Sequence, residues 1–329
     1  MKKKRVFSGI QPSGRLHIGN YVGAMRNMIS LQDKYFCIYG IVDYHAMTVR
    51  FNPREMEERI SNCAVDYIAA GIDPEKSILM LQSMVSAHTE LAWILNTITS
   101  ISWLLRVPTF KEKRQENPDY VHMGLLDYPV LMAADIIVYK AEVVPVGDDQ
   151  LPHLELTREI VRRFNSYFGH VFPEPQSYLG KVPRILGLDG INKMSKSLDN
   201  AIYLDETQEE MWKKLASAVT DTNRKRKTDA GDPDVCNIFT IHKAFSPKKD
   251  VTYCADQCRT AGIGCLDCKK ILLENMYNEL EPIQKRQKEL RDKKDYVRGV
   301  LQEGCKRARE ITEKTMSEVY EKIGIKSFH

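Results

Sequence analysis

Two short stretches of this 329-residue chain carry side chains suited to binding a polyphosphate. The first, GIQPSGRLHIGN over residues 9–20, contains glycines that permit close backbone approach, and its His17 can donate to phosphate oxygens. The second, KMSKS over residues 193–197, holds Lys193 and Lys196, which can neutralise the charge that develops as phosphorus is attacked. Either stretch alone is also compatible with a plain glycine turn or an exposed hinge. Together they favour chemistry on a nucleotide triphosphate.

The elements that must position the first stretch read as alternating strands and helices. Residues 5–8, 36–42 and 77–82 are short β-branched and aromatic runs bounded by polar residues or glycine, as buried strands are. Apolar residues recur at helical spacing over 19–33 and 55–70. A strand, a turn, a helix and a second strand form a βαβ unit, which implies a parallel sheet. We therefore expect a doubly wound α/β fold.

The character of the sequence changes after about residue 200. Amphipathic helical patterns run over 206–219, 269–294 and 296–323, and Pro282 indicates a new start or a kink in the second of them. We therefore predict a catalytic domain over residues 1–200 and a helical domain over residues 201–329.

The composition excludes several classes of protein. With 43% hydrophobic residues and a formal net charge of +4, the chain is neither disordered nor collagen-like. Its longest apolar run, residues 128–139, is shorter than the roughly 18–20 residues that cross a bilayer, and it contains Asp135. The basic start lacks the apolar stretch of a signal peptide. We expect a cytoplasmic protein without membrane spans.

The cysteines form a further candidate site. Five of the eight fall between residues 236 and 268, and such clustering in a chain that is not secreted indicates a metal in preference to disulfides. Four of them have the spacing C-x21-C-x6-C-x2-C: Cys236, Cys258, Cys265 and Cys268. Four thiolates suit tetrahedral zinc or a four-iron four-sulfur cluster. Cys254 is a fifth thiol that can replace Cys236, and reduced or disulfide-bonded cysteines without metal are the remaining alternative.

The two polyphosphate-binding stretches resemble the two signatures of the class I aminoacyl-tRNA synthetases. Asn20 stands where the family pattern has its second histidine, a departure that many members of one branch share. Four further segments are similar to the members that activate tryptophan: Val42–Ala46, Phe110–Lys113, Met132–Ile136 and Val144–Gln150. The match extends from Phe7 to about residue 220. It implies a Rossmann-type catalytic domain followed by a helical domain that binds the tRNA anticodon.

The resemblance implies a tryptophan pocket in which Asp135 accepts a hydrogen bond from the indole N–H. An aspartate inside an apolar helix needs a buried partner, and the indole is one; a helix cap or a salt bridge is the alternative. The other residues implied for the pocket are Phe7, Val42, His45, Met132 and Val144 as its walls, and Tyr128 and Gln150 as partners of the substrate's amino group.

The resemblance also implies the ATP site and the reaction. His17, Lys113, Lys193 and Lys196 are the implied catalytic side chains, with Mg²⁺ as the bridging ion. The residues implied to bind ATP are Gln11, Pro12, Ser13, Gly19, Asn20, Gly147, Asp148, Asp149, Ile185, Lys193, Met194, Ser195, Lys196 and Ser197. The tryptophan carboxylate would attack the α-phosphorus and release pyrophosphate, and tryptophan would then pass to its tRNA. Because the carboxylate is already ionised, catalysis needs orientation and charge stabilisation and no side-chain nucleophile.

Family members further imply a homodimer, to which the apolar stretch Trp93–Val107 would contribute unless it is simply core. Some members carry a four-iron four-sulfur cluster in the tRNA-binding domain at nearly this cysteine spacing. We therefore expect such a cluster here, or zinc instead, in a structural or anticodon-contacting role. Two rival interpretations are a tyrosine-activating member of the same class and an RNA-binding paralogue without activity.

Overall fold

The computed structural model describes residues 3–116, 118–180, 185–195 and 198–326, and its contacts divide the chain into two compact units. Unit 1 comprises residues 1–14, 28–179 and 293–329, and unit 2 comprises residues 15–27 and 180–292. None of the helices in the described part of the chain has an apolar stretch long enough to cross a membrane.

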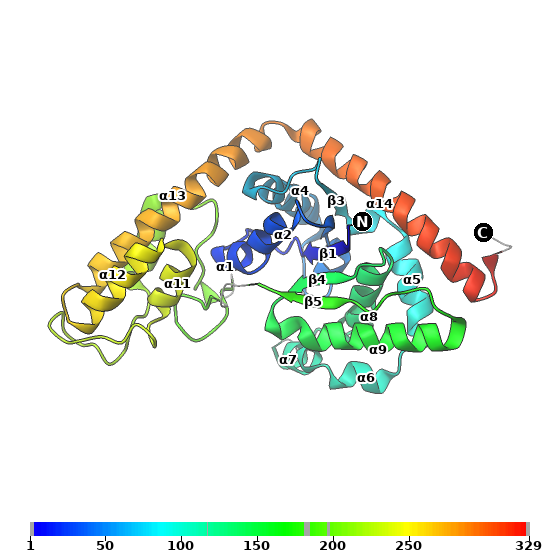
Figure 1. The fold of residues 1–329 in the computed structure, drawn as a ribbon, viewed down its shortest axis with the longest axis horizontal. Coiled ribbons are helices and arrows are strands. Elements are labelled where there is room, and N and C mark those ends of the chain that lie inside the picture. The colour runs from blue at the N-terminus through cyan, green and yellow to red at the C-terminus, as the bar shows by residue number, and fades with distance from the viewer. Residues whose placement is uncertain (1–2, 117, 181–184, 196–197, 327–329) are drawn as a thin grey trace. The chain divides into compact units, whose positions relative to one another are not determined.

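Unit 1 is built on a five-stranded parallel sheet (Figure 1). Its strands are β1 (Arg5–Ile10), β2 (Phe36–Ile41), β3 (Ser77–Leu81), β4 (Val143–Val146) and β5 (Gln176–Leu179), in the order β3-β2-β1-β4-β5. The register sets Phe7 opposite Ile38, and Val6 opposite Val143. The strand order reverses at β1, which makes the carboxyl ends of β1 and β4 the point where such sheets bind ligands. The predicted doubly wound α/β fold is confirmed.

Helices cover both faces of this sheet, which is why its central strands are largely apolar. In Figure 1, α4 lies on one side of the sheet and α8 and α9 lie on the other. The helical segments that belong wholly to unit 1 are α3 (Asp43–Ala46), α4 (Pro53–Ala70), η2 (Gln82–Met84), α5 (Ala87–Asn96), α6 (Ile101–Arg106), α7 (Pro108–Glu116), α8 (Met123–Ile137), η3 (Asp148–Gln150), α9 (Leu151–Phe168) and α14 (Lys294–Lys322).

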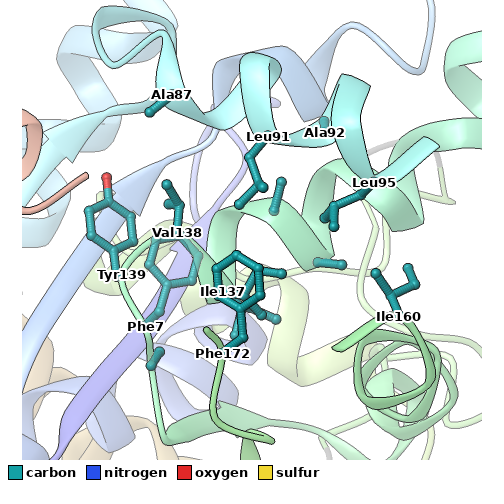
Figure 2. Packing of buried hydrophobic residues seen from close by; sticks show 14 of the residues in the cluster. Phe7, Ala87, Leu91, Ala92, Leu95, Ile137, Val138, Tyr139, Ile160 and Phe172 are labelled. Atoms are coloured by element: carbon teal, nitrogen blue, oxygen red, sulfur yellow. The ribbon is translucent and has the colours of Figure 1, made fainter. Parts of the chain in front are cut away.

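The main core of unit 1 joins the sheet to α5, α8, α9 and α14. Figure 2 shows Leu91 and Leu95 of α5 facing Ile137, with Ile160 of α9 and Phe172 beside them. Each of these side chains is fully buried, and burial of one leucine or isoleucine stabilises a fold by about 1.5–3 kcal/mol. The core therefore holds α8, which carries the predicted pocket residues, rigidly against the strand ends.

Unit 2 is largely helical. It contains α1 (Ile18–Asn20), η1 (Tyr21–Met25), α10 (Gln208–Ser217), α11 (Asn237–Phe245), α12 (Lys248–Arg259) and α13 (Cys265–Arg291), and α2 (Arg26–Leu31) begins in it. The Arg26 guanidinium donates to Glu279 of α13 and to the Ala244 carbonyl of α11, each at 2.6 Å. Lys269 is buried and donates to the Ala216 and Ala218 carbonyls, so it satisfies the carboxyl end of α10.

The predicted helices are present with shifted ends. The 55–70 helix starts two residues earlier because Asn52 caps it, and the 206–219 helix starts at Gln208 because Thr207 and Glu210 form a capping box. The expected helix over 19–33 is continuous from Ile18 to Leu31 but includes the π-helical η1. The helix expected over 269–294 starts at Cys265 and runs through Pro282, so no new helix starts there.

The compact units do not follow the predicted division at residue 200. The last helix, α14, belongs to unit 1 because its buried stripe, which includes Cys305 and Ala308, packs on β3 and α5. The Cys305 Sγ accepts a hydrogen bond from the Leu81 N–H at 3.2 Å. The division into a catalytic domain over residues 1–200 and a helical domain over residues 201–329 therefore remains a prediction about function. In the structure, α14 packs with the sheet of unit 1.

Gly304 shows how closely α14 approaches the sheet. A Cβ at this position would fall on the main-chain oxygen of Leu79 in β3, whereas a Cβ at Gly299 on the same helix would meet open space. We expect Gly304→Ala to lower the free energy of unfolding by about 1–3 kcal/mol, because the overpacked contact outweighs the better helix propensity of alanine. Urea unfolding of the purified variant measures this.

Gly299→Ala is the matched control, and we expect it to stabilise the protein by about 0.5–1 kcal/mol through helix propensity alone. Equal stabilisation by both substitutions would contradict the close approach of α14 to β3.

Candidate functional site

The residues predicted to bind tryptophan belong to unit 1 and lie on or after β1, β2 and β4 and on α8. Phe7 lies on β1, Val42 and His45 at and just after the end of β2, and Val144 on β4; Tyr128, Met132 and Asp135 project from α8, and Gln150 ends η3. Two glycines keep this edge of the sheet open. A Cβ at Gly40 would lie 3.3 Å from Val42 Cγ1 and 3.5 Å from Phe7 Cζ, and one at Gly9 would lie 2.8 Å from Val42 Cγ1. Larger residues would crowd the apolar walls.

Asp135 is the polar centre of this cluster. Its side chain is only 2% exposed, and three neutral or cationic groups bond to it at 2.7 Å each. His45 Nε2 contacts Oδ2, whereas Gln82 Nε2 and His88 Nδ1 both contact Oδ1. Burial alone would raise the pKa of this carboxyl, but the charge and hydrogen bond of His45 and the hydrogen bond of His88 outweigh burial and lower the pKa to about 2. Asp135 is therefore a buried carboxylate anion.

Two of these partners, Gln82 and His88, were not predicted from the sequence. Gln82 directly follows β3, and His88 is a polar residue in an otherwise apolar helix face, so each carried a signal of a buried polar role. The fold supplies three protein partners for Asp135, so its burial does not depend on the indole N–H. The indole N–H remains a predicted additional partner.

Tyr128 forms a second polar group at the same edge. Its hydroxyl lies 2.7 Å from His153 Nε2, and the ammonium of Lys113 lies 4.8 Å from the centre of its ring. Burial, followed by the positive charge of Lys113, lowers the pKa of His153 to about 4. His153 is thus a neutral imidazole that fixes the phenol hydroxyl, and it too was missed from the sequence. Lys113 and Tyr128, predicted from separate segments, are brought together.

Residues predicted for ATP lie in both units. In unit 1, Gln11, Pro12 and Ser13 directly follow β1, and the Ser13 N–H donates to the Gln11 carbonyl at 2.8 Å. Gly147 precedes η3, which holds Asp148 and Asp149, and Gln150 donates to Asp149 at 3.1 Å.

In unit 2, His17 and Asn20 form a capping box at the start of α1. The His17 Nδ1 accepts from the Asn20 N–H at 3.3 Å, and the Asn20 side chain accepts from the His17 N–H at 3.1 Å. Burial lowers the pKa of His17 to about 4, so the ring is neutral and can serve as this acceptor. The first signature is therefore held by its own histidine and asparagine.

The second signature lies against the first within unit 2. Met194 is buried, and its Sδ lies 3.6 Å from where a Cβ on Gly19 would be. The Asn200 side chain fixes the backbone of residues 193–195. It accepts a hydrogen bond from the Ser195 N–H at 2.8 Å and donates one to the Lys193 carbonyl at 3.0 Å. Lys193 pairs with Leu186 in a β-bridge beside the buried Ile185. The predictions for Lys196 and Ser197 lie outside the described residues.

The cysteine cluster also lies within unit 2, at the junction of α11, α12 and α13. Ligand atoms of His242, Cys254 and Cys268 all lie within 4.8 Å of one another, close enough to hold one metal ion. Cys258 and Cys265 each place Sγ 3.8 Å from the same nitrogen of Arg224. The fold thus gathers thiols that are separated in sequence, and it adds His242, which sequence spacing did not reveal.

Comparison with known proteins agrees with this geometry. The family described as tRNA synthetases class I (W and Y) matches residues 1–281. A tryptophan–tRNA ligase of Deinococcus radiodurans is 47% identical over 325 residues, covering 97% of this chain and 98% of its own, and one of Thermotoga maritima is 44% identical over 320 residues, covering 96% and 97%. The structure of Campylobacter jejuni tryptophanyl-tRNA synthetase with ADP and tryptophan superposes with a TM-score of 0.85 at 35% identity, over 97% of this chain and 99% of that one.

The chain belongs to the class I tRNA synthetases. Within that class it belongs to the tryptophan–tRNA ligase family. The resemblance drawn from the sequence signatures is therefore confirmed.

Two histidines with lowered pKa values, the half-buried His17 and the buried His153, make stability depend on pH. In the folded protein His17 and His153 each have a pKa of about 4, so both rings stay neutral down to about pH 4. In the unfolded chain each pKa is near the ordinary value of 6.5. The contribution of the two neutral histidines to the free energy of unfolding is therefore complete above pH 6.5. It is lost as the pH falls towards 4, by up to about 1.4 kcal/mol per pH unit for each histidine. We expect His153→Gln to flatten the slope of unfolding free energy between pH 6.5 and 4.5, measured by urea unfolding.

His170→Gln, at an exposed histidine, is the control that should leave the slope unchanged. An unaltered slope in His153→Gln would show that His153 is not held neutral.

Proposed function

We propose that the chain is a tryptophan–tRNA ligase that forms tryptophanyl-adenylate from tryptophan and ATP and then charges its tRNA. The observation that carries the proposal is the buried Asp135 carboxylate beside apolar side chains, in a chain of this family. An anionic acceptor in a dry apolar site favours a flat apolar ring with one N–H donor, which is an indole. Phenylalanine would leave the carboxylate without that partner, and such mismatches support discrimination of about 10⁴–10⁵-fold.

In the first step an oxygen of the tryptophan carboxylate attacks the α-phosphorus of ATP. The new carboxyl–phosphorus bond replaces the bond to the bridging oxygen, and pyrophosphate leaves with that electron pair. Lys113, Lys193 and Lys196 would stabilise the charge on the leaving group, and Mg²⁺ bound with ATP would supply further positive charge. No protein proton is transferred in this step, so orientation and electrostatics provide the catalysis. In the second step a terminal ribose hydroxyl of the tRNA displaces AMP from the adenylate.

We further propose that Tyr128 and Gln150 bind the amino group of the substrate. A phenol oxygen fixed by neutral His153 has lone pairs left for an ammonium, because the imidazole Nε2 can accept the phenol proton. The walls of the pocket are then Phe7, Val42, His45, Met132 and Val144.

For the cysteines we propose a four-iron four-sulfur cluster held by Cys236, Cys258, Cys265 and Cys268, with zinc as the alternative. The guanidinium of Arg224 against two of these sulfurs suits a thiolate set, whose negative charge it offsets. Such a group would cross-link α11, α12 and α13 and so stabilise the tRNA-binding region.

We propose that the protein is cytoplasmic, since tRNA is a substrate of the reaction. We also propose that it forms a homodimer. Support for the dimer comes from large apolar side chains that unit 1 leaves exposed around the predicted interface. Trp93 is 73% exposed, Ile101 65% and Met123 73%, which is unusual for residues of this size.

Asp135→Asn tests the tryptophan pocket. Asparagine replaces one acceptor oxygen of Asp135 by an NH₂ group, which would face the hydrogen-bond donors around it. We therefore expect kcat/KM for tryptophan to fall by about 10–200-fold, which is the equivalent of one hydrogen bond to a charged group. ATP–pyrophosphate exchange measures this, and the KM for ATP should change little. Asp66→Asn, at a buried carboxylate on α4, is the control. Equal activity of Asp135→Asn and the unmodified protein would overturn the assignment.

The cysteine proposal is tested by Cys265→Ser and Cys268→Ser on anaerobically purified protein. We expect both variants to lose iron and acid-labile sulfide, and to lose tRNA charging or stability of the helical region, while adenylate formation persists. Cys63→Ala, at a buried cysteine of α4, should keep the metal content. Metal analysis that finds zinc would replace the cluster by the alternative, and protein without metal would refute both.

A further inference from the structure

A chain of hydrogen bonds extends from Asp135 away from the predicted substrate. His88 is fully buried and bonds through both ring nitrogens, by Nδ1 to Asp135 Oδ1 at 2.7 Å and by Nε2 to the Tyr139 hydroxyl at 2.9 Å. Tyr139 is buried as well, and its ring stacks on Phe7 with centroids 5.5 Å apart and planes at 13°. Figure 2 shows the Tyr139 ring beside Phe7, with its hydroxyl directed towards α5 at Ala87.

The directions of these hydrogen bonds follow from the ionised carboxylate. Asp135 can only accept, so His88 Nδ1 must carry the proton of this bond; in a neutral imidazole with that proton, Nε2 is an acceptor that the Tyr139 hydroxyl can fill. Burial raises the pKa of Tyr139 well above its ordinary value, which keeps this hydroxyl protonated and able to donate. A Tyr139 hydroxyl that donates to Nε2 thus favours the tautomer of His88 that donates to Asp135.

Counting lone pairs shows what this arrangement leaves for a ligand. A carboxylate offers about four acceptor positions, two on each oxygen. His88 and Gln82 fill both positions on Oδ1, while His45 fills one on Oδ2. Among the residues that the structure describes, these leave one acceptor position, on Oδ2.

We propose that His88, held in one tautomer by Tyr139, is a positioning residue that sets the specificity for the indole N–H by saturating Oδ1 of Asp135 and leaving a single acceptor on Oδ2. The inference rests on the proposed function, because it assigns the last acceptor of Asp135 to the substrate. Neither residue contacts the substrate in this account. Their effect is on which donor the pocket accepts and in what direction.

Tyr139→Phe tests the proposal because it removes only the hydroxyl. The probe is β-(3-benzothienyl)-L-alanine, in which sulfur replaces the indole N–H with little change in shape. We measure kcat/KM for tryptophan and for this analogue in ATP–pyrophosphate exchange. The ratio of the two values should fall by about ten-fold, because His88 becomes free to adopt the other tautomer and Asp135 free to turn. A role in packing alone would reduce both values equally and leave the ratio unchanged.

Tyr39→Phe is the matched control, since it removes another fully buried hydroxyl, which donates to the Met28 carbonyl at 2.6 Å. Its ratio should match that of the unmodified protein. His88→Leu should lower the ratio at least as far as Tyr139→Phe, and His88→Gln, which keeps a donor for Asp135, should restore part of it.

Thermal unfolding confirms that each variant is folded. A normal ratio in Tyr139→Phe, in folded protein that activates tryptophan, overturns the inference and leaves the proposed function intact. An unmodified protein that does not activate tryptophan refutes the proposed function itself.

Discussion

The buried charge of Asp135 is the constraint on which the pocket depends. An ionised carboxyl in an apolar interior costs several kcal/mol unless it is hydrogen-bonded, so the fold must bring donors to it. His45, Gln82 and His88 meet this need from three different elements, α3, η2 and α5. These elements follow β2 and β3, whose parallel register sets their ends side by side. The parallel sheet thus brings together the three donors that allow this anion to be buried.

The two units carry chemically different parts of the function. Unit 1 holds the buried Asp135 carboxylate and the apolar side chains that we propose select the amino acid. Unit 2 holds residues 15–20 of the first polyphosphate signature and the described part of the second. There the structure is maintained by side chains within or next to the signatures, such as His17 and Asn20 in the capping box and Asn200 at the lysine segment.

The parallel sheet, both signatures and the candidate residue Asp135 were predictable from the sequence. Strand periodicity, glycine placement and a charge in an apolar run are local patterns. The roles of His88, Gln82 and His153 were not predicted, since their contacts with Asp135 and Tyr128 join elements that are far apart in the chain. The same limit applies to α14, whose amphipathic pattern predicted a helix but not that Gly304 would lie on Leu79 of β3. At the cysteines, spacing named the thiols, whereas His242 joined them only through the packing of α11 against α13.

The most direct test of the account is ATP–pyrophosphate exchange by the unmodified, anaerobically purified protein with tryptophan, tyrosine and phenylalanine offered in parallel. A single acceptor on a buried carboxylate predicts exchange with tryptophan and none above background with the other two. Exchange with tyrosine would contradict the assignment of the pocket, and absence of exchange with all three, in folded protein, would contradict the proposed activity.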